Sequence, residues 1–368
     1  MGFLKKLLPF ALAGASLQGL AVGADFPQED INSGKALQQI GQTALDNALA
    51  RLEGGSSTCT KENVRRRKEW RNIPGEERKA YVEAVECLME LPNVYENVTG
   101  PKSMFDSFGV LHYKMTPYVH NSCAQAYFLL FHRLYVWTFE EKLRTMCGYT
   151  GAFPYWEWGL DAGSVENSPL FDGSETSLGS NGAKVNTTNP GFFPGGSGGG
   201  CVTQGPFVNL RAYNPRCLKR DLNTQICAQW ASLQNTTETI LESPDIALFQ
   251  ANLQGDFRWP EARKWGFAVH GGGHFAIAGD PGGDFYFSPL EPGFYQHHGQ
   301  IDRMYFIWQN LDWENRQTMA GTITMMNRPE SRNGTLDDVL DISPVGGSFK
   351  YHELLDTVGA SPFCFVYE

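Results

Sequence analysis

The placement of the histidines constrains this chain more than any other feature of its sequence. It has eight histidines in 368 residues, and seven of them fall within two short segments, residues 112–132 and 270–298. Imidazole nitrogen binds Cu, Zn, Fe and Ni ions, so two such clusters predict a metal centre with nitrogen ligands. The eighth, His352, stands alone, and we expect it to be an ordinary surface or core residue.

Each segment can supply three imidazoles. The first contains His112, His120 and His132, and the second contains His270, His274, His297 and His298. His270 and His274 are four residues apart, which would place both rings on one face of a helix. The three glycines between them, residues 271–273, disfavour a helix by up to about 1 kcal/mol each relative to alanine, so a loop is the alternative. Either conformation would let both rings reach one metal, and the glycines would leave room above it.

Ligand imidazoles need an acceptor for their second ring nitrogen, and acidic residues follow both segments. We expect His298 to begin a helix whose next turn carries Asp302. That carboxylate could hold a ring nitrogen or position Arg303. A zinc hydrolase is the first competing interpretation, but position 271, where HExxH enzymes have their catalytic glutamate, is a glycine.

The surroundings of these histidines resemble the tyrosinase and catechol oxidase family. Residues 128–140, around His132, look like its first copper motif, and residues 291–303, around His298, look like its second. Residues 154–158, 67–70 and 365–367 are also similar to the family. The resemblance implies two copper ions, and it selects His298 over His297 because the family's ligand lies four residues before the aspartate. The implied ligands are His112, His120 and His132 for one copper ion and His270, His274 and His298 for the other.

Three departures from the family pattern affect this assignment. The spacing from His120 to His132 is longer than usual, and Cys123 stands nearer to the usual position of the second ligand. Where family members often have a cysteine linked to that histidine ring, this chain has Tyr118. Glu291 replaces the usual aspartate of the second motif, which should leave copper binding intact.

The resemblance implies O2-dependent oxidation of small phenols. Members hold a water for monophenol hydroxylation with a glutamate and an asparagine; Glu261 matches the glutamate, but Gly271 stands at the asparagine position and offers no side chain. We therefore expect oxidation of o-diphenols to o-quinones with weaker monophenol hydroxylation. The alternatives are full monophenolase activity, or oxygen carriage as in haemocyanins. Glu261 could also be an ordinary solvated charge.

Aromatic residues follow the two histidines at 270 and 274. Phe285, Tyr286 and Phe287 lie between the second and third implied ligands of the second copper ion. We expect one of them to overhang the first copper ion and restrict access for substrate.

The N-terminal residues predict secretion. Residues 1–24 have two lysines, a short apolar stretch and a small-residue end, which is typical of a signal peptide rather than a membrane anchor. Its removal takes away two lysines and no acidic residue, so the net charge changes from −10 to −12. This acidic balance argues against a nucleic-acid partner. We expect a soluble protein without membrane attachment, and the sequence indicates no oligomeric state.

Cysteines and sequons agree with an extracellular location. The eight cysteines form no CxxC pair and suggest disulfides, although their pairing does not follow from the sequence. Sequons at Asn97, Asn186, Asn235 and Asn333 are candidate glycosylation sites.

The expected fold is mainly α, a helical bundle core around the dinuclear copper site, with long loops and little β-structure. Helical patterns cover residues 25–55, 76–89, 127–146, 218–233 and 301–315, whereas residues 159–215 are rich in Gly, Ser and Asn and predict loops. We expect one catalytic domain at residues 25–368. No C-terminal shielding domain is expected, because only about seventy residues follow His298.

Overall fold

The structure is a computed structural model that describes residues 25–53, 58–120, 126–186, 194–211, 216–256, 258–259, 261–262 and 266–368. The expected signal peptide and Cys123 lie outside the described residues.

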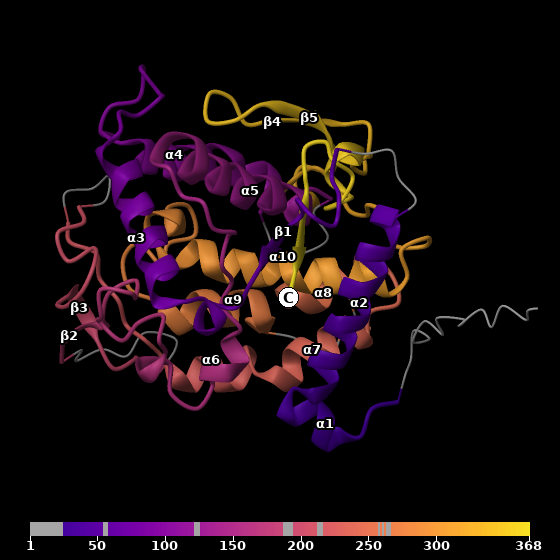
Figure 1. Cartoon of the computed structure of the whole chain (residues 1–368), viewed down its shortest axis with the longest axis horizontal. Coiled ribbons are helices and arrows are strands. Elements are labelled where there is room, and N and C mark those ends of the chain that lie inside the picture. Colours follow the sequence, from indigo (N-terminus) through magenta and orange to yellow (C-terminus); the bar gives the residue numbers. More distant parts are fainter. Residues whose placement is uncertain are drawn as a thin grey trace, which may run out of the picture.

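The described residues form a mainly helical fold with three two-stranded sheets, as expected (Figure 1). The helices are α1 (Gln28–Ser33), α2 (Lys35–Glu53), α3 (Gly75–Glu90), α4 (Met104–Val119), α5 (Phe128–Cys147), α6 (Thr224–Trp230), α7 (Leu233–Leu241), α8 (Ile246–Gln254), α9 (Ala268–Ile277) and α10 (Gly293–Leu311). The strands are β1 (Arg65–Arg67), β2 (Gly182–Lys184), β3 (Gly199–Val202), β4 (Val339–Asp341), β5 (Ser348–Lys350) and β6 (Phe365–Tyr367). No described helix has both the length and the apolar character needed to span a membrane.

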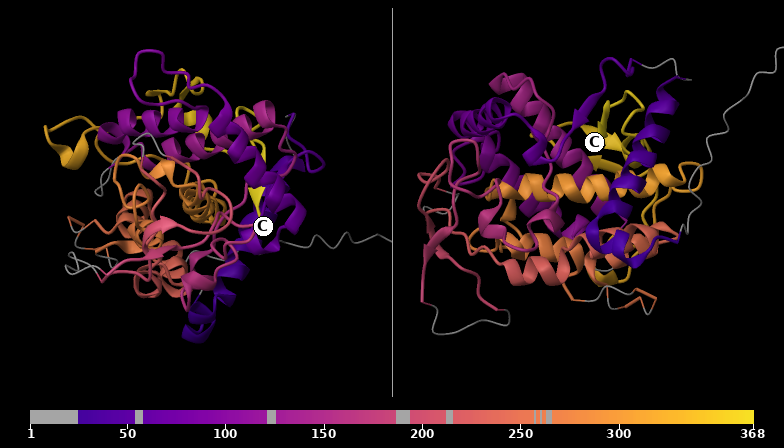
Figure 2. Two further views of the ribbon diagram at one scale, coloured as in Figure 1. Left: turned by 90° about the vertical axis from the view of Figure 1, so that its left-hand side faces the viewer. Right: turned by 60° about the horizontal axis from the view of Figure 1, so that its bottom comes forward.

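Helix α10 forms the centre of the molecule. It contacts α2, α5, α7 and α9, and its residues are buried from Gly293 to Asn310. In both views of Figure 2, α4 and α5 lie on one side of it and α6 to α9 on the other. A helix that is buried all round yet carries two histidines, an aspartate and an arginine must satisfy those polar groups internally, which points to a functional site.

Local sequence explains how the helices around α10 begin and end. Ser103 and Asp106 form a capping box at the start of α4, each accepting a backbone N–H from the other's residue. Helix α5 ends at Gly148, whose φ of 71° is the left-handed conformation that glycine adopts readily. These two helices are thereby oriented to present one histidine each.

The helix predictions are confirmed for α3 and α5 and corrected elsewhere. The pattern at residues 25–55 divides into α1 and α2 at Gly34, and within residues 218–233 only Thr224–Trp230 forms a complete helix. His298 does not begin a helix, because α10 starts five residues earlier, at Gly293. Helices α4, α7 and α8 were not predicted.

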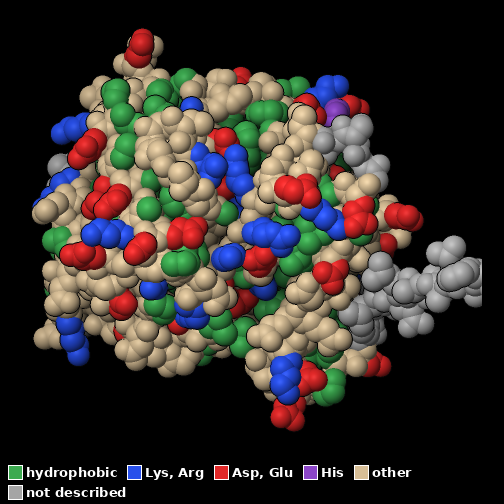
Figure 3. Space-filling model, viewed as in Figure 1, with side chains coloured by type: hydrophobic (Ala, Val, Ile, Leu, Met, Phe, Trp, Pro, Cys, Tyr) green, Lys and Arg blue, Asp and Glu red, His purple; other side chains and the backbone are tan. Residues whose placement is uncertain are grey.

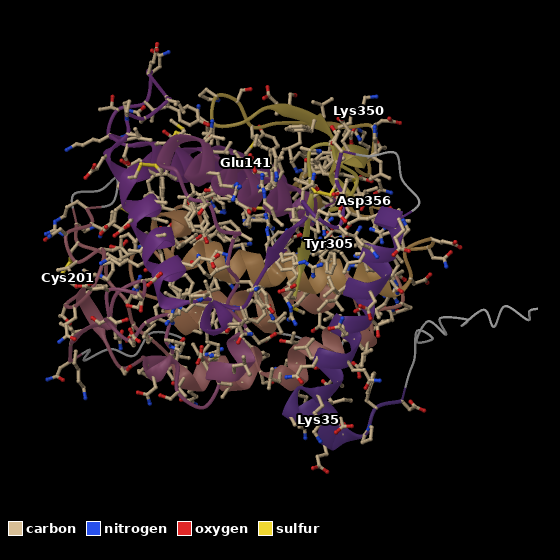
Figure 4. All side chains as sticks on the ribbon, in the orientation of Figure 1. Lys35, Glu141, Cys201, Tyr305, Lys350 and Asp356 are labelled. Atoms are coloured by element: carbon tan, nitrogen blue, oxygen red, sulfur yellow. A yellow bond between two sulfur atoms is a disulfide. The ribbon has the colours of Figure 1, made fainter. Side chains whose placement is uncertain are left out.

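The region predicted as loops is irregular where it is described. Between residues 159 and 211 it contains two short 3-10 turns and the β2–β3 pair. The disulfide between Cys201 and Cys217 anchors it, and Figure 4 places Cys201 at the edge of the molecule. This region therefore covers the core without contributing a helix to it.

Two further disulfides hold the helical core. Cys87 is bonded to Cys147, which joins α3 to α5, and Cys59 is bonded to Cys364. Beside the second bond, β1 pairs with β6 in parallel register, so that Arg67 lies opposite Tyr367. The prediction of disulfides is thus confirmed. The even number of cysteines does not mean that all of them pair, because Cys227 is buried and forms no disulfide.

Candidate metal centre

The first histidine group comes from α4 and α5. His112 is on α4, His120 is the residue directly after that helix, and His132 is on α5. The ring of His120 lies 4.5 Å from that of His112 and 4.6 Å from that of His132, and all three are buried. One potential ligand atom from each lies within 4.8 Å of the others, so the group could hold a metal ion.

Backbone carbonyls orient two of these rings. Nδ1 of His112 contacts the carbonyl oxygen of Tyr286 at 2.7 Å, and Nδ1 of His132 contacts that of Phe128 at 2.8 Å. A carbonyl can only accept, so each Nδ1 must carry the proton. Each Nε2 is then left with a free lone pair, and neither has a partner among the described residues. This is the tautomer in which a histidine binds a metal ion.

The second histidine group comes from α9 and α10. His270 and His274 lie one turn apart on α9, so the helical alternative for this segment is confirmed. Nε2 of His274 lies 3.3 Å from Nε2 of His298 on α10, and Nε2 of His270 is buried with no partner in the described part of the chain. Ring nitrogens that converge in this way are suited to sharing one ion.

His297 belongs spatially to the second group, and one of its ring nitrogens lies within 4.8 Å of a ring nitrogen of each of the other three histidines. It is fully buried and neither ring nitrogen has a partner among the described residues. Its ring packs 5.3 Å from Trp158 and lies nearly parallel to His270 at 5.6 Å. A Cβ at Gly273 would stand 2.3 Å from its Nδ1, so that glycine makes room for His297.

Each glycine between His270 and His274 therefore has its own structural explanation. A Cβ at Gly272 would stand 2.6 Å from the Cβ of Trp230, so this position is also restricted by packing. Only Gly271 lines the open cavity beside the histidines. The expectation that all three glycines leave room above the metal is thus corrected to Gly271 alone.

The two histidine groups face each other in the interior of the molecule. His132 and His298 stack at 4.2 Å with 12° between the rings, and the ring of Phe128 lies 4.6 Å from His132 and 4.8 Å from His270. Two three-imidazole groups in direct contact, with an apolar ring beside them, fit two metal ions that act together.

Burial keeps these imidazoles neutral. It lowers the pKa of His112 to about 4 and that of His270 to about 3. It also lowers the pKa of His298 well below the usual value, and the neighbouring histidines add to this effect. Near neutral pH the rings are therefore unprotonated at the ligand nitrogen, as metal binding requires.

A buried ionic network connects the two helices that carry His132 and His298. Nε of Arg133 donates to Asp302 at 2.6 Å, and the hydroxyl of Tyr367 donates to the same carboxylate at 2.7 Å. Arg67 pairs with Glu140 at 2.5 Å and with Asp302 at 3.4 Å. Both Asp302 and Glu140 thus bind arginines. Asp302 neither holds a ring nitrogen nor pairs with Arg303, which corrects that expectation.

The same network is enclosed by aromatic rings. The guanidinium carbon of Arg133 lies 4.4 Å from the ring centre of Tyr305, which is labelled in Figure 4. That of Arg67 lies 3.5 Å from the ring centre of Phe365. The pieces around residues 67, 133, 302 and 367 that resemble the family therefore meet in one place.

An open cavity of about 230 Å³ leads to the second histidine group. His120, His270, His274 and Gly271 are among its lining residues, together with Phe285. The ring of Phe285 lies 5.5 Å from His120. Of the three consecutive aromatic residues, Phe285 is thus the one that overhangs the first group.

The polar residues that line this cavity differ from those that the sequence predicted. Glu261 is exposed in a turn and is not among the described residues that line the cavity. Gln254, the last residue of α8, does line it, is 6 % exposed, and its Nε2 has no partner among the described residues. Gln254 lies sixteen residues before His270 and nothing in its local sequence marks it as a site residue.

Proteins of similar sequence and fold include tyrosinases and a polyphenol oxidase. The family described as the common central domain of tyrosinase matches residues 102–311, more than half of the chain. Tyrosinase P from Aspergillus terreus is 34% identical over 337 residues, covering 82% of this chain and 91% of that protein. An N-acetyl-6-hydroxytryptophan oxidase from Emericella nidulans is 33% identical over 367 residues, covering 88% and 98%.

A solved relative extends the agreement to the whole fold. A mutant of the polyphenol oxidase from Thermothelomyces thermophila superimposes with a TM-score of 0.84 at 31% identity, covering 92% of this chain and all of that one. Copper is the metal indicated by the similarity to this polyphenol oxidase, by the two histidine groups and by the family assignment. The chain therefore belongs to the tyrosinase family and is a copper-dependent oxidoreductase that oxidises phenols.

Proposed function

We propose that this enzyme oxidises o-diphenols to o-quinones with O2 and hydroxylates monophenols more weakly. The observation that carries the proposal is the cavity beside His270, where Gly271 contributes no side chain and the exposed Glu261 is not among the lining residues. An o-diphenol needs only a route for two electrons and two protons, whereas a monophenol also needs a group that takes its proton before hydroxylation.

The ligand assignment is part of the same proposal. His112, His120 and His132 hold one copper ion, and His270, His274 and His298 hold the other. Bound in pairs, copper ions supply one-electron transfers to O2 and accept electrons from the phenol. His297 stays outside the proposed ligand set, because its ring packs against Trp158 and fills the space beside Gly273.

The chain itself binds and orients the phenol. The cavity admits an aromatic ring beside His270 and His274, and Phe285 forms one wall of it. Phe128, between the groups, excludes water from the space around the ligand nitrogens. Gln254 presents an amide N–H to the cavity that can donate to a phenol oxygen but cannot remove its proton.

The one acidic residue described in the cavity lining is also poorly placed as a base. Asp284 uses its Oδ1 to accept the backbone N–H groups of Tyr286 and Phe287, at 2.7 and 2.8 Å. In accepting these two N–H groups, the carboxylate stabilises the turn of the backbone at the cavity mouth. Only the second oxygen of this carboxylate is then left to accept a proton from a monophenol, which favours diphenol oxidation.

The test compares turnover with metal content. We expect two copper ions per chain, near-ultraviolet absorption after addition of H2O2, and a kcat/KM for catechol well above that for the matching monophenol. Reversible O2 binding with little quinone would instead indicate a carrier, and one zinc ion per chain would indicate a hydrolase. Equal efficiency on both phenols would reject the diphenol preference while leaving the family assignment intact.

The location and domain extent complete the proposal. We infer that residues 1–24 are removed on secretion and that residues 25–368 form one catalytic domain. The three disulfides support an oxidising compartment, and Asn97, Asn186 and Asn333 are exposed. The side chain of Asn235 donates to the carbonyls of Gln229 and Trp230, so we expect less glycosylation there. Mass spectrometry of secreted protein, with and without glycosidase, tests the cleavage site and the sequons.

Charge on the surface agrees with small-molecule substrates. On the face drawn in Figure 3, acidic and basic side chains are interspersed and do not gather by sign. With a net charge of −10, the chain is poorly suited to bind a phosphate backbone.

A further inference from the structure

The mouth of the copper cavity carries aromatic side chains on the outside. Tyr113 is 50% exposed, Phe285 is 47% exposed and Tyr286 is 38% exposed. Exposed aromatic residues cost hydration free energy and are unremarkable when scattered singly. When several lie together, they mark a binding surface.

These rings form a continuous row that begins at a copper ligand. Phe285 lies 5.5 Å from His120, Tyr286 lies 5.3 Å from Phe285, and Tyr113 lies 5.6 Å from Tyr286. At the outer end, Tyr113 stacks on Phe287 at 5.2 Å with 9° between the planes. The row therefore extends from the cavity onto the surface.

The backbone beneath this row is held in place. The Asp284 carboxylate accepts the N–H groups of Tyr286 and Phe287, and the Tyr286 carbonyl accepts from Nδ1 of His112. A platform ordered before the substrate arrives loses little conformational entropy on binding. Its position relative to the copper ligands is also set by that last hydrogen bond.

The size of the cavity shows why a platform outside it matters. A cavity on the order of 150 Å³ holds one benzene ring, and this one measures about 230 Å³. It therefore accommodates one substituted phenol ring but not a second ring. Any further ring of a substrate must lie across the mouth, where Tyr286 and Tyr113 are exposed.

We propose that the row formed by Phe285, Tyr286, Tyr113 and Phe287 is a second subsite, which binds the distal aromatic ring of a two-ring phenol. The preferred substrate class is then a phenol joined to another aromatic group through a short linker. This inference rests on the proposed phenol oxidation. It adds no chemical step, because the distal ring only binds.

The experiment compares catechol with a catechol that carries a phenylethyl group. In the natural enzyme, we expect the two-ring substrate to have the lower KM. Tyr113→Ala should raise that KM about three- to tenfold relative to the KM for catechol, because one aromatic contact is lost. Tyr113→Phe keeps the ring and should retain the preference. Tyr118→Ala is the matched control, since Tyr118 is 59% exposed on the same helix and has no ring contact with the row among the described residues.

Three results would overturn the subsite. These are an absent two-ring preference in the natural enzyme, an unchanged preference in Tyr113→Ala, or an equal loss in Tyr118→Ala. Calorimetry with a two-ring resorcinol measures binding to the copper-loaded protein without turnover. Failure of the proposed function would leave catechol unoxidised while the Tyr113-dependent binding remains, so the two failures are distinguishable.

Discussion

The two histidine groups differ in how the chain holds their rings. In the first group, carbonyl oxygens of Tyr286 and Phe128 fix the tautomer of His112 and His132. In the second group, Nδ1 of His298 has no partner among the described residues, and a fourth histidine, His297, stands within reach. Hydrogen bonds to carbonyl oxygens thus orient two rings of the first group, whereas the position of His298 in the second group is set by the packing of α10.

Contacts between the segments that carry the two groups also make the position of each group depend on the other. The carbonyl of Tyr286, which orients His112, belongs to the segment between α9 and α10. In addition, Arg133 follows His132 on α5 and pairs with Asp302, one turn after His298 on α10. The position of one histidine group relative to the other is therefore fixed by contacts between the two segments of the chain that carry them.

Replacing ligands of the second group should have the largest effect. We expect His298→Ala to abolish catechol oxidation and to remove about one of the two copper ions, because it leaves one site with two imidazoles. His297→Ala should keep its copper, although loss of a buried ring will lower stability. Copper is quantified by atomic absorption, alongside quinone formation. Equal copper loss in both variants would mean that the fourth histidine is a ligand.

Breaking the connection between α5 and α10 should affect both groups at once. Asp302→Ala leaves the buried guanidinium of Arg133 without its carboxylate, and removal of one partner of such a pair costs about 3–5 kcal/mol. Chemical denaturation of the copper-free protein measures this loss. The control is Asp337→Ala, which removes an exposed partner of Lys350 and should cost less than about 0.5 kcal/mol. Similar values for the two variants would argue against the network as the connection.

Acid should weaken the copper-free protein through both groups. Burial lowers the folded-state pKa of His112 to about 4, below the usual 6.5, so the unfolded chain binds protons more readily. Stability is then fully present above about pH 6.5 and is lost as the pH falls toward 4, on the order of 3 kcal/mol for this residue. His112→Gln should flatten that dependence, measured by denaturation between pH 7 and 4. His352→Gln, which replaces an exposed histidine outside both groups, is the matched control variant.

The smallest expected effect is on the ratio of monophenol to diphenol activity, when Gly271 beside His270 is replaced. Gly271→Asn should raise the ratio of monophenol to diphenol activity about three- to tenfold, because its amide can help to hold a water at the cavity. The new Cβ would stand 3.1 Å from Cβ of Phe267, which must yield by a few tenths of an ångström. Gly271→Ala introduces the same contact without the amide and serves as the control. A ratio that rises equally in both variants would assign the change to Phe267 rather than to water.

The histidine groups were predictable because ligand spacing is a local property of the sequence. His270 and His274 share a face through the helical repeat alone, and α3 and α5 follow from their apolar periodicity. Helix α4 was missed because Gly109 and Pro117 interrupt its pattern, and tertiary packing stabilises it instead. The segment around Lys219 was wrongly predicted as helical, since its backbone forms bridges with Cys201 and Pro281.

The supporting residues were harder to predict than the histidines. The sequence motifs indicated that Asp302 matters, but its arginine partners lie 169 and 235 positions away in the chain. Gln254 reaches the cavity only because α8 contacts α9. Such roles arise from contacts between distant segments, which periodicity does not report.

The bond between Cys59 and Cys364 has a consequence for how the enzyme withstands proteolysis. Strand β6 brings Tyr367 to Asp302, and this strand follows directly after Cys364. A protease that cuts within residues 343–363 would therefore not release the closing strand, because the sulfur bridge keeps it attached. Nicked enzyme should migrate as a single species on a non-reducing gel and separate into fragments when thiol is added, while its copper site survives the cut.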